Sequence, residues 1–153
     1  MSTQKVNHLL TQLENYIPVS NKKNTAVSSQ DVAWHIYHSL LVLKYICLDI
    51  QTSDPKNYKW KFNFWRLVVM GKNKIPRGKG KAPSRVLPKE EITIDLIKST
   101  LEETKKEIEK LETLSANHYF KHPFFGELNM KPSIKFLALH TQHHVDIIKD
   151  ILA

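Results

Sequence analysis

Apolar residues recur at three- and four-residue intervals in four segments of the chain, the spacing that places them on one face of a helix. The segments span residues 3–17, 28–51, 94–114 and 129–153. The second is apolar nearly all round, which is typical of a central helix contacted on several sides. No segment alternates with period two for long enough to predict a sheet. The pattern therefore predicts an all-α protein, a four-helix bundle with a long crossover between helices 2 and 3.

Local signals support the boundaries of these helices. Ser28 precedes Asp31 by three residues, the spacing of an N-cap followed by an acidic first turn. Asn129 can cap the last helix, and Pro132 falls within its first turn, where a missing N–H costs little. With 153 residues, the chain is long enough for one core, so we expect a single domain over residues 1–153.

The connection between the second and third helices has an unusual composition. Residues 55–89 contain no Asp or Glu and 11 of the 23 basic side chains, which leaves 12 basic against 15 acidic residues elsewhere. We therefore expect a slightly acidic body with one strongly basic segment, despite a net charge of +8. Within this basic crossover, residues 58–70 are predicted to form a short aromatic-rich helix and residues 72–88 a loop.

Two kinds of side chain in the basic crossover are candidates for a specific role. We expect its aromatic residues to anchor the crossover onto the bundle, with a stacking platform for single-stranded nucleic acid as the alternative. These residues are Trp60, Phe62, Phe64 and Trp65. Arg77, Lys79 and Lys81 are candidates to bind an anionic small-molecule substrate, whereas nucleic acid is not the expected partner.

Nothing in the sequence predicts secretion or a membrane partner. No apolar run approaches the roughly 20 residues that span a bilayer, and the polar N-terminal residues show no secretory signal. The single cysteine, Cys47, cannot form an internal disulfide and lies on an apolar stripe, where inert packing is expected. We therefore expect a cytoplasmic protein. The sequence leaves open whether it forms a homodimer.

Five of the eight histidines fall on two predicted helices, His35 and His38 on the second and the others on the last. At about 100° per residue, His140 and His144 lie one turn apart within the apolar arc of the last helix. His143 falls at the edge of that arc, and Asp146 on the polar side. Because buried imidazoles need partners, the pair indicates either a metal site or two core histidines that bind carbonyl or hydroxyl groups.

A metal site would take a third ligand from the second helix, where face counting does not choose between His35 and His38. Imidazole ligands suit zinc, nickel or iron. Three histidines without a fourth side chain leave a coordination position open, the pattern of catalytic sites. No carboxylate pairs of the di-iron type accompany them.

Two short motifs resemble those of the DinB-like superfamily. The C-terminal one comprises His122-Pro123-Phe124-Phe125-Gly126-Glu127-Leu128 followed by His140-Thr141-Gln142-His143-His144, and the other is Val32-Ala33-Trp34-His35-Ile36. The resemblance implies a four-helix bundle with a three-histidine metal site and assigns ligand roles to His35, His140 and His144. His38 departs from the superfamily pattern. Some relatives are metal-dependent thiol transferases, and many others have no known activity.

These observations give two hypotheses for function. In the first, the protein is a metal-dependent transferase or hydrolase whose ion makes a nucleophile available at neutral pH. In the second, it is a non-catalytic binding module whose basic crossover contacts an anionic partner. His122 is expected to be structural in both.

Overall fold

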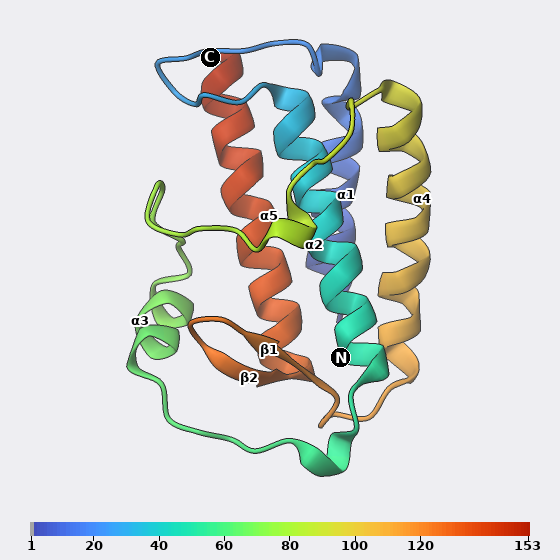
Figure 1. Ribbon diagram of the computed structural model, residues 1–153, viewed down its shortest axis with the longest axis vertical. Helices are drawn as coiled ribbons and strands as arrows, with labels where there is room; N and C mark the ends of the chain where they lie inside the picture. The colour runs from blue at the N-terminus through green and yellow to red at the C-terminus, as the bar shows by residue number, and fades with distance from the viewer. Residues whose placement is uncertain (1) are drawn as a thin grey trace.

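The computed structural model describes residues 2–153, and its framework is four long helices that lie side by side (Figure 1). They are α1 (Gln4–Asn15), α2 (Val32–Thr52), α4 (Ile94–Lys110) and α5 (Met130–Leu152). A shorter helix, α3 (Phe64–Lys72), lies outside them near a hairpin of β1 (Tyr119–His122) and β2 (Gly126–Asn129). Residues 2–153 therefore form a predominantly helical fold with one small sheet.

Helix α2 is the central helix, as its apolar sequence predicts, and it packs against both α4 and α5. Leu40, Leu43, Cys47 and Ile50 on this helix have no exposed surface. Burial raises the pKa of the Cys47 thiol to about 12, which agrees with a packing role rather than a reactive one. Despite the apolar character of α2, no helix within residues 2–153 is long and apolar enough to cross a membrane.

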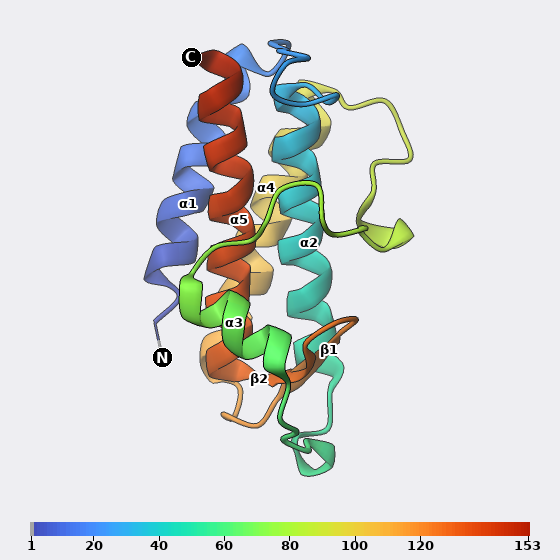
Figure 2. The same ribbon diagram turned by 90° about the vertical axis from the view of Figure 1, so that its left-hand side faces the viewer.

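The crossover between α2 and α4 lets these two helices run in the same direction, opposite to α1 and α5 (Figure 1). After α3 the chain passes across the outside of α5 and α2 (Figure 2). An ion pair of 2.7 Å joins Arg77 in this stretch to Asp150 on α5. Further along, Arg85 pairs with Asp49 of α2. The crossover is therefore fastened to the two helices that carry most of the histidines.

Two predicted boundaries within residues 28–70 are wrong. Helix α2 begins at Val32, because the Asp31 carboxylate accepts the Trp34 N–H at 2.8 Å. Asp31 is therefore the N-cap, and not Ser28 as the sequence pattern predicts. Helix α3 begins only at Phe64, because Asn63 caps it by accepting the Arg66 N–H. The residues before Asn63 in the predicted aromatic helix are not helical.

The hairpin contradicts the prediction of a protein without a sheet. Strands β1 and β2 pair antiparallel, with Tyr119 opposite Asn129 and His122 opposite Gly126. Each strand has only four residues, too few for period-two alternation to stand out from the sequence. Gly126 has a positive φ of 71°, the left-handed conformation that glycine adopts without strain.

The predicted anchoring role of the aromatic residues is also wrong. Trp60, Phe62, Phe64 and Trp65 are 58–67% exposed and do not pack into the core. Helix α3 is attached instead through buried Met70 and through Arg66. The Arg66 guanidinium donates hydrogen bonds to the backbone carbonyls of Phe125 at 3.4 Å and Glu127 at 3.3 Å.

Candidate metal centre

Three histidine side chains from two helices meet in the interior: His38 from α2, and His140 and His144 from α5. Each offers a ring nitrogen, and these three nitrogens lie within 4.8 Å of one another. The ring centroids are 4.7 Å apart for His140 and His144, and 4.8 Å and 5.3 Å from His38 to His144 and His140. His38 and His144 are buried, while His140 is partly exposed. The three residues could therefore hold one metal ion.

His35 is not a member of this group, although it contacts His144. Its Nδ1 is 2.9 Å from Nδ1 of His144, and its Nε2 is 2.9 Å from the hydroxyl oxygen of Ser28. Both ring nitrogens thus already have partners. The superfamily resemblance assigns a ligand role to His35, but the structure groups His38 with the α5 pair. Helix α2 is buried on so many sides that its apolar pattern could not separate the two residues.

Hydrogen bonds fix the ring of His38. The Val86 carbonyl can only accept, so Nδ1 of His38 carries the proton that it donates across 2.7 Å. This leaves Nε2 of His38 as the nitrogen with a free lone pair. The Trp34 indole stacks on the same imidazole with the ring centroids 4.7 Å apart. Outer contacts of this kind hold a histidine in the tautomer and orientation that a metal requires.

His140 on α5 has a ring nitrogen without a hydrogen-bond partner. Nδ1 of His140 is shielded from solvent and makes no hydrogen bond within residues 2–153. An unpaired buried polar group costs about 1–3 kcal/mol. The donor set is three imidazoles, which suits a divalent transition metal. The side chains present therefore fit a metal ion, which would use the nitrogens left without protein partners.

The electrostatics of the site favour neutral imidazoles. Burial lowers the pKa of His38, and it lowers those of His140 and His144 well below the usual value near 6.5. Neighbouring histidines lower the pKa values of His140 and His144 further, since two positive rings would repel each other. All three histidines are therefore uncharged at neutral pH, the form in which imidazole binds a metal.

The three basic residues predicted to contact a substrate differ in their surroundings: Arg77 is ion-paired, whereas Lys79 and Lys81 are exposed. Arg77 is close enough to the cluster that its charge contributes, after burial, to a lowered pKa of His143 and of His35. Its guanidinium is paired with Asp150, so it is not a free cation. Lys79 and Lys81 are exposed on the loop that follows. Of the three, Arg77 alone lowers the pKa values of histidines that neighbour the cluster.

His122 lies at the end of β1 and supports the site in the structural role that its sequence context predicts. Its Nδ1 accepts the backbone N–H groups of Phe124 and Phe125, both at 3.1 Å. Its ring stacks on Phe125 with centroids 4.2 Å apart and meets Phe136 edge-on at 4.7 Å. Phe136 in turn lies 5.9 Å from the ring of His140. Burial lowers the pKa of His122 to about 4.

Replacing His122 with asparagine is expected to make the protein less sensitive to acid. Unfolded His122 titrates near pH 6.5, whereas the folded residue stays neutral down to its pKa of about 4. In the window between these two pH values, residue 122 binds more protons in the unfolded state than in the folded state. His122 therefore makes the free energy of unfolding rise with pH, by up to about 1.4 kcal/mol per pH unit. Asparagine keeps an acceptor for the turn and removes this dependence. Urea unfolding across the window should give a shallower slope for His122→Asn, and an unchanged slope would refute the assignment.

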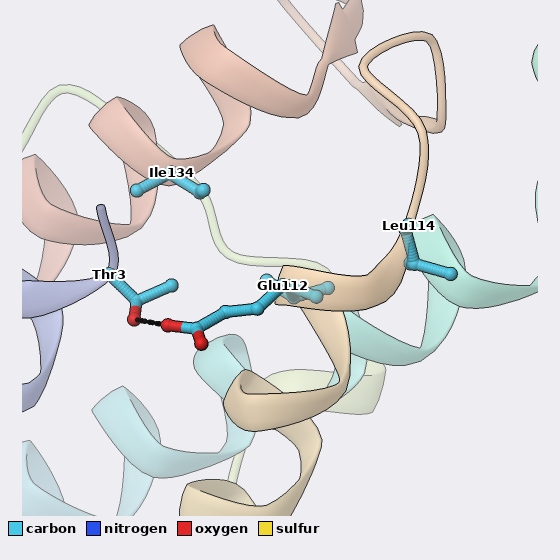
Figure 3. Close-up of a pocket in the computed structure, with 5 residues that line it drawn as sticks. Thr3, Glu112, Leu114 and Ile134 are labelled. Atoms are coloured by element: carbon cyan, nitrogen blue, oxygen red, sulfur yellow. Dashed lines mark hydrogen bonds between the residues drawn. The ribbon is translucent and has the colours of Figure 1, made fainter. Parts of the chain in front are cut away.

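Two pockets in residues 2–153 lie away from the histidines. One, of about 170 Å³, lies between Thr3, the residues that follow α4 and the start of α5. Figure 3 shows that its two polar side chains satisfy each other, because the Thr3 hydroxyl donates to Glu112 at 2.8 Å. A second, of about 490 Å³, lies between α1 and α4 near Ile17 and Ile94. Neither pocket contains a metal-ligating cluster, so the histidines remain the candidate functional site.

The fold and site together define a mostly helical protein with a possible three-histidine metal centre. No family model, curated protein or solved structure matches the chain. The inference of function therefore rests on the chain's own residues.

Proposed function

We propose that this chain is a DinB-like four-helix-bundle protein that binds one divalent metal ion through His38, His140 and His144. The convergence of three neutral imidazoles from two helices supports the proposal most directly. The motifs around His122 and at the start of α2 support the superfamily. The ligand role implied for His35 moves to His38, because both nitrogens of His35 have protein partners.

The competing interpretation treats the cluster as ordinary core histidines, each satisfied by a neighbouring polar group. His35 and His38 fit that description, since Ser28 and Val86 bind them. His140 does not, because its buried Nδ1 has no partner. A shared ion would explain why this arrangement is stable, and the core interpretation offers no compensation for the unpaired nitrogen.

We further propose that the ion serves a metal-dependent transferase or hydrolase. Three protein ligands leave a coordination position for another group, as in catalytic sites, and zinc, nickel and iron all suit imidazole. The bound ion would supply a Lewis acid that activates a nucleophile at neutral pH. His35 holds the ring of His144, and Val86 holds that of His38. A small anionic substrate would have to displace Asp150 to pair with Arg77.

Titration of the metal-free protein with Co²⁺, a coloured substitute for zinc, tests the proposal. Visible absorption from a histidine-bound ion is expected to rise and to saturate at one equivalent per chain. The His143→Ala variant is the matched control, because it removes a neighbouring imidazole of α5 outside the cluster of three, and it should saturate at the same point. Absorption that stays at the level of free Co²⁺ would disprove the metal centre.

A further inference from the structure

Helix α3 presents an apolar face to solvent on the outside of the molecule. Phe64, Trp65 and Leu67 are 58%, 65% and 61% exposed, although they are among the most apolar residues of the helix. Its opposite side is apolar as well, with Met70 buried and Val69 packed against the core. A surface helix normally turns polar side chains to water. The outer face of α3 therefore has the composition of a surface that is covered in the functional state.

Further exposed aromatic side chains lie beside this helix. We use the name aromatic patch for six residues that are each 58–67% exposed: Trp60, Phe62, Phe64, Trp65, Leu67 and Phe124. The hairpin turn joins the patch because the Asn63 amide donates to the Phe124 carbonyl at 2.7 Å. Trp60 joins it because the Arg66 guanidinium lies 5.7 Å from its ring. These contacts hold the start of α3 against the hairpin turn and place Trp60 beside the helix.

The charge around the aromatic patch is positive. Residues 55–89, which include five of its six members, contain no acidic side chain. The nearby Glu127 carboxylate is already engaged, since it accepts the backbone N–H of Lys59 at 2.8 Å. A symmetric dimer through this face would bring two basic segments together, which like charges oppose. The patch therefore suits an anionic partner better than a second copy of the chain.

The kind of basic residue available narrows the choice of anionic partner. All three arginines of residues 55–89 are committed within the protein: Arg66 to backbone carbonyls, Arg77 to Asp150 and Arg85 to Asp49. The cations left beside the patch are exposed lysines, among them Lys59, Lys61 and Lys72. Lysine is a flexible point charge without the fork that recognises one phosphate in a fixed geometry. Such charges suit a diffuse anionic surface.

The apolar members of the patch also favour a lipid surface over a nucleic acid. Leu67 has no π-face on which a base could stack, yet it is as exposed as its aromatic neighbours. Tryptophan and phenylalanine insert readily at the boundary between headgroups and acyl chains, and lysine stems reach back to the anionic headgroups. Docking of this kind needs no membrane-spanning helix, so it is compatible with the apolar run lengths of the chain.

We propose that the aromatic patch docks this protein onto the surface of a bilayer that contains anionic lipids. Trp65, Leu67 and their neighbours insert into the headgroup boundary, and the surrounding lysines contact the lipid charges. This proposal revises the expectation of no membrane partner and is independent of the metal centre.

Vesicle flotation tests the docking surface with the intact chain. The wild-type protein is expected to float with phosphatidylcholine vesicles that contain phosphatidylglycerol, and at least tenfold less with phosphatidylcholine alone. Trp65→Ala/Leu67→Ala should lower flotation at least tenfold, and Lys59→Gln/Lys61→Gln should lower it to a smaller extent. Ile94→Ala is the matched control, because Ile94 is apolar and 49% exposed but lies on α4. It should float like the wild type.

Several outcomes would overturn the proposal. Wild-type protein that stays with the soluble fraction would refute it, as would flotation that the Trp65→Ala/Leu67→Ala variant retains. Tight binding of a single-stranded oligonucleotide that depends on the patch, without vesicle binding, would make the surface a nucleic-acid platform instead. A dimer in sedimentation that the double variant abolishes would assign the patch to self-association. Because the substituted side chains are exposed, unchanged thermal melts are expected to show that the variants fold.

Discussion

Replacing His140 with alanine is expected to weaken divalent metal binding strongly, because it removes one of the two proposed ligands on α5. The variant removes one of three ligands and leaves two imidazoles from different helices, His38 and His144. Loss of an outer-shell partner typically lowers metal affinity roughly 10–100-fold, so loss of a ligand should exceed that range. Competition between the protein and a coloured chelator for Zn²⁺ measures the change. Affinity within a few-fold of the wild type would remove His140 from the ligand set.

Alanine variants of His35 and His38 test which of these two residues is the third metal ligand. His38→Ala should match His140→Ala, whereas His35→Ala should cause only the roughly 10–100-fold loss of an outer-shell residue. His35 contributes through its contact with Nδ1 of His144, not through the ion. The reverse order of the two losses would restore His35 as the ligand. His143→Ala serves again as the control with near-normal affinity.

Replacing Leu40 with alanine is expected to lower the free energy of unfolding by about 2–5 kcal/mol. Leu40 has no exposed surface and lies at the middle of α2, the helix that packs against both α4 and α5. The buried Thr104 hydroxyl of α4 lies 3.4 Å from the Leu40 carbonyl, so α2 and α4 are already close at this point. They therefore have little room to move together and fill the cavity that alanine would leave. For a domain of this size the melting temperature should fall by roughly 5–15 °C.

Leu152→Ala provides the comparison for this loss of stability. Leu152 is 38% exposed at the end of α5, and a substitution there should change the free energy of unfolding by at most about 0.5 kcal/mol. Chemical denaturation of both variants at one pH measures the difference. Equal losses for Leu40→Ala and Leu152→Ala would mean that α2 is not the centre of the core.

The long helices could be predicted because each spans several turns, over which apolar spacing becomes distinctive. Ile97 and Leu101 illustrate this: they are apolar residues four positions apart in the predicted segment 94–114, and both are buried in α4. The four-residue strands of the hairpin were missed because so short a segment carries no period. The start of α2 was misplaced because Ser28 and Asp31 are both good capping residues, and only the backbone geometry decides between them.

The site was predictable where one helix determined it and unpredictable where two segments had to meet. The turn spacing of His140 and His144 placed both on the inner face of α5 from sequence alone. The choice of His38 depends on how α2 is rotated against α5, which an evenly apolar helix does not encode. The Val86 carbonyl that orients His38 comes from a distant part of the crossover, and no side-chain pattern reveals a backbone acceptor. The aromatic residues of the crossover are predicted to pack onto the bundle because large aromatic side chains are usually buried, but those of α3 are exposed.

The origin of the three histidines also bears on the order of events during folding. His38 and the α5 pair are separated in the chain by the crossover, α4 and the hairpin. An ion held by all three would act as a cross-link that closes this long loop, and loop closure restricts the unfolded chain more than the folded one. The nascent protein can therefore complete its cluster only after α5 has been synthesised and docked. Metal capture would then be a late event, and separation of α2 from α5 would release the ion.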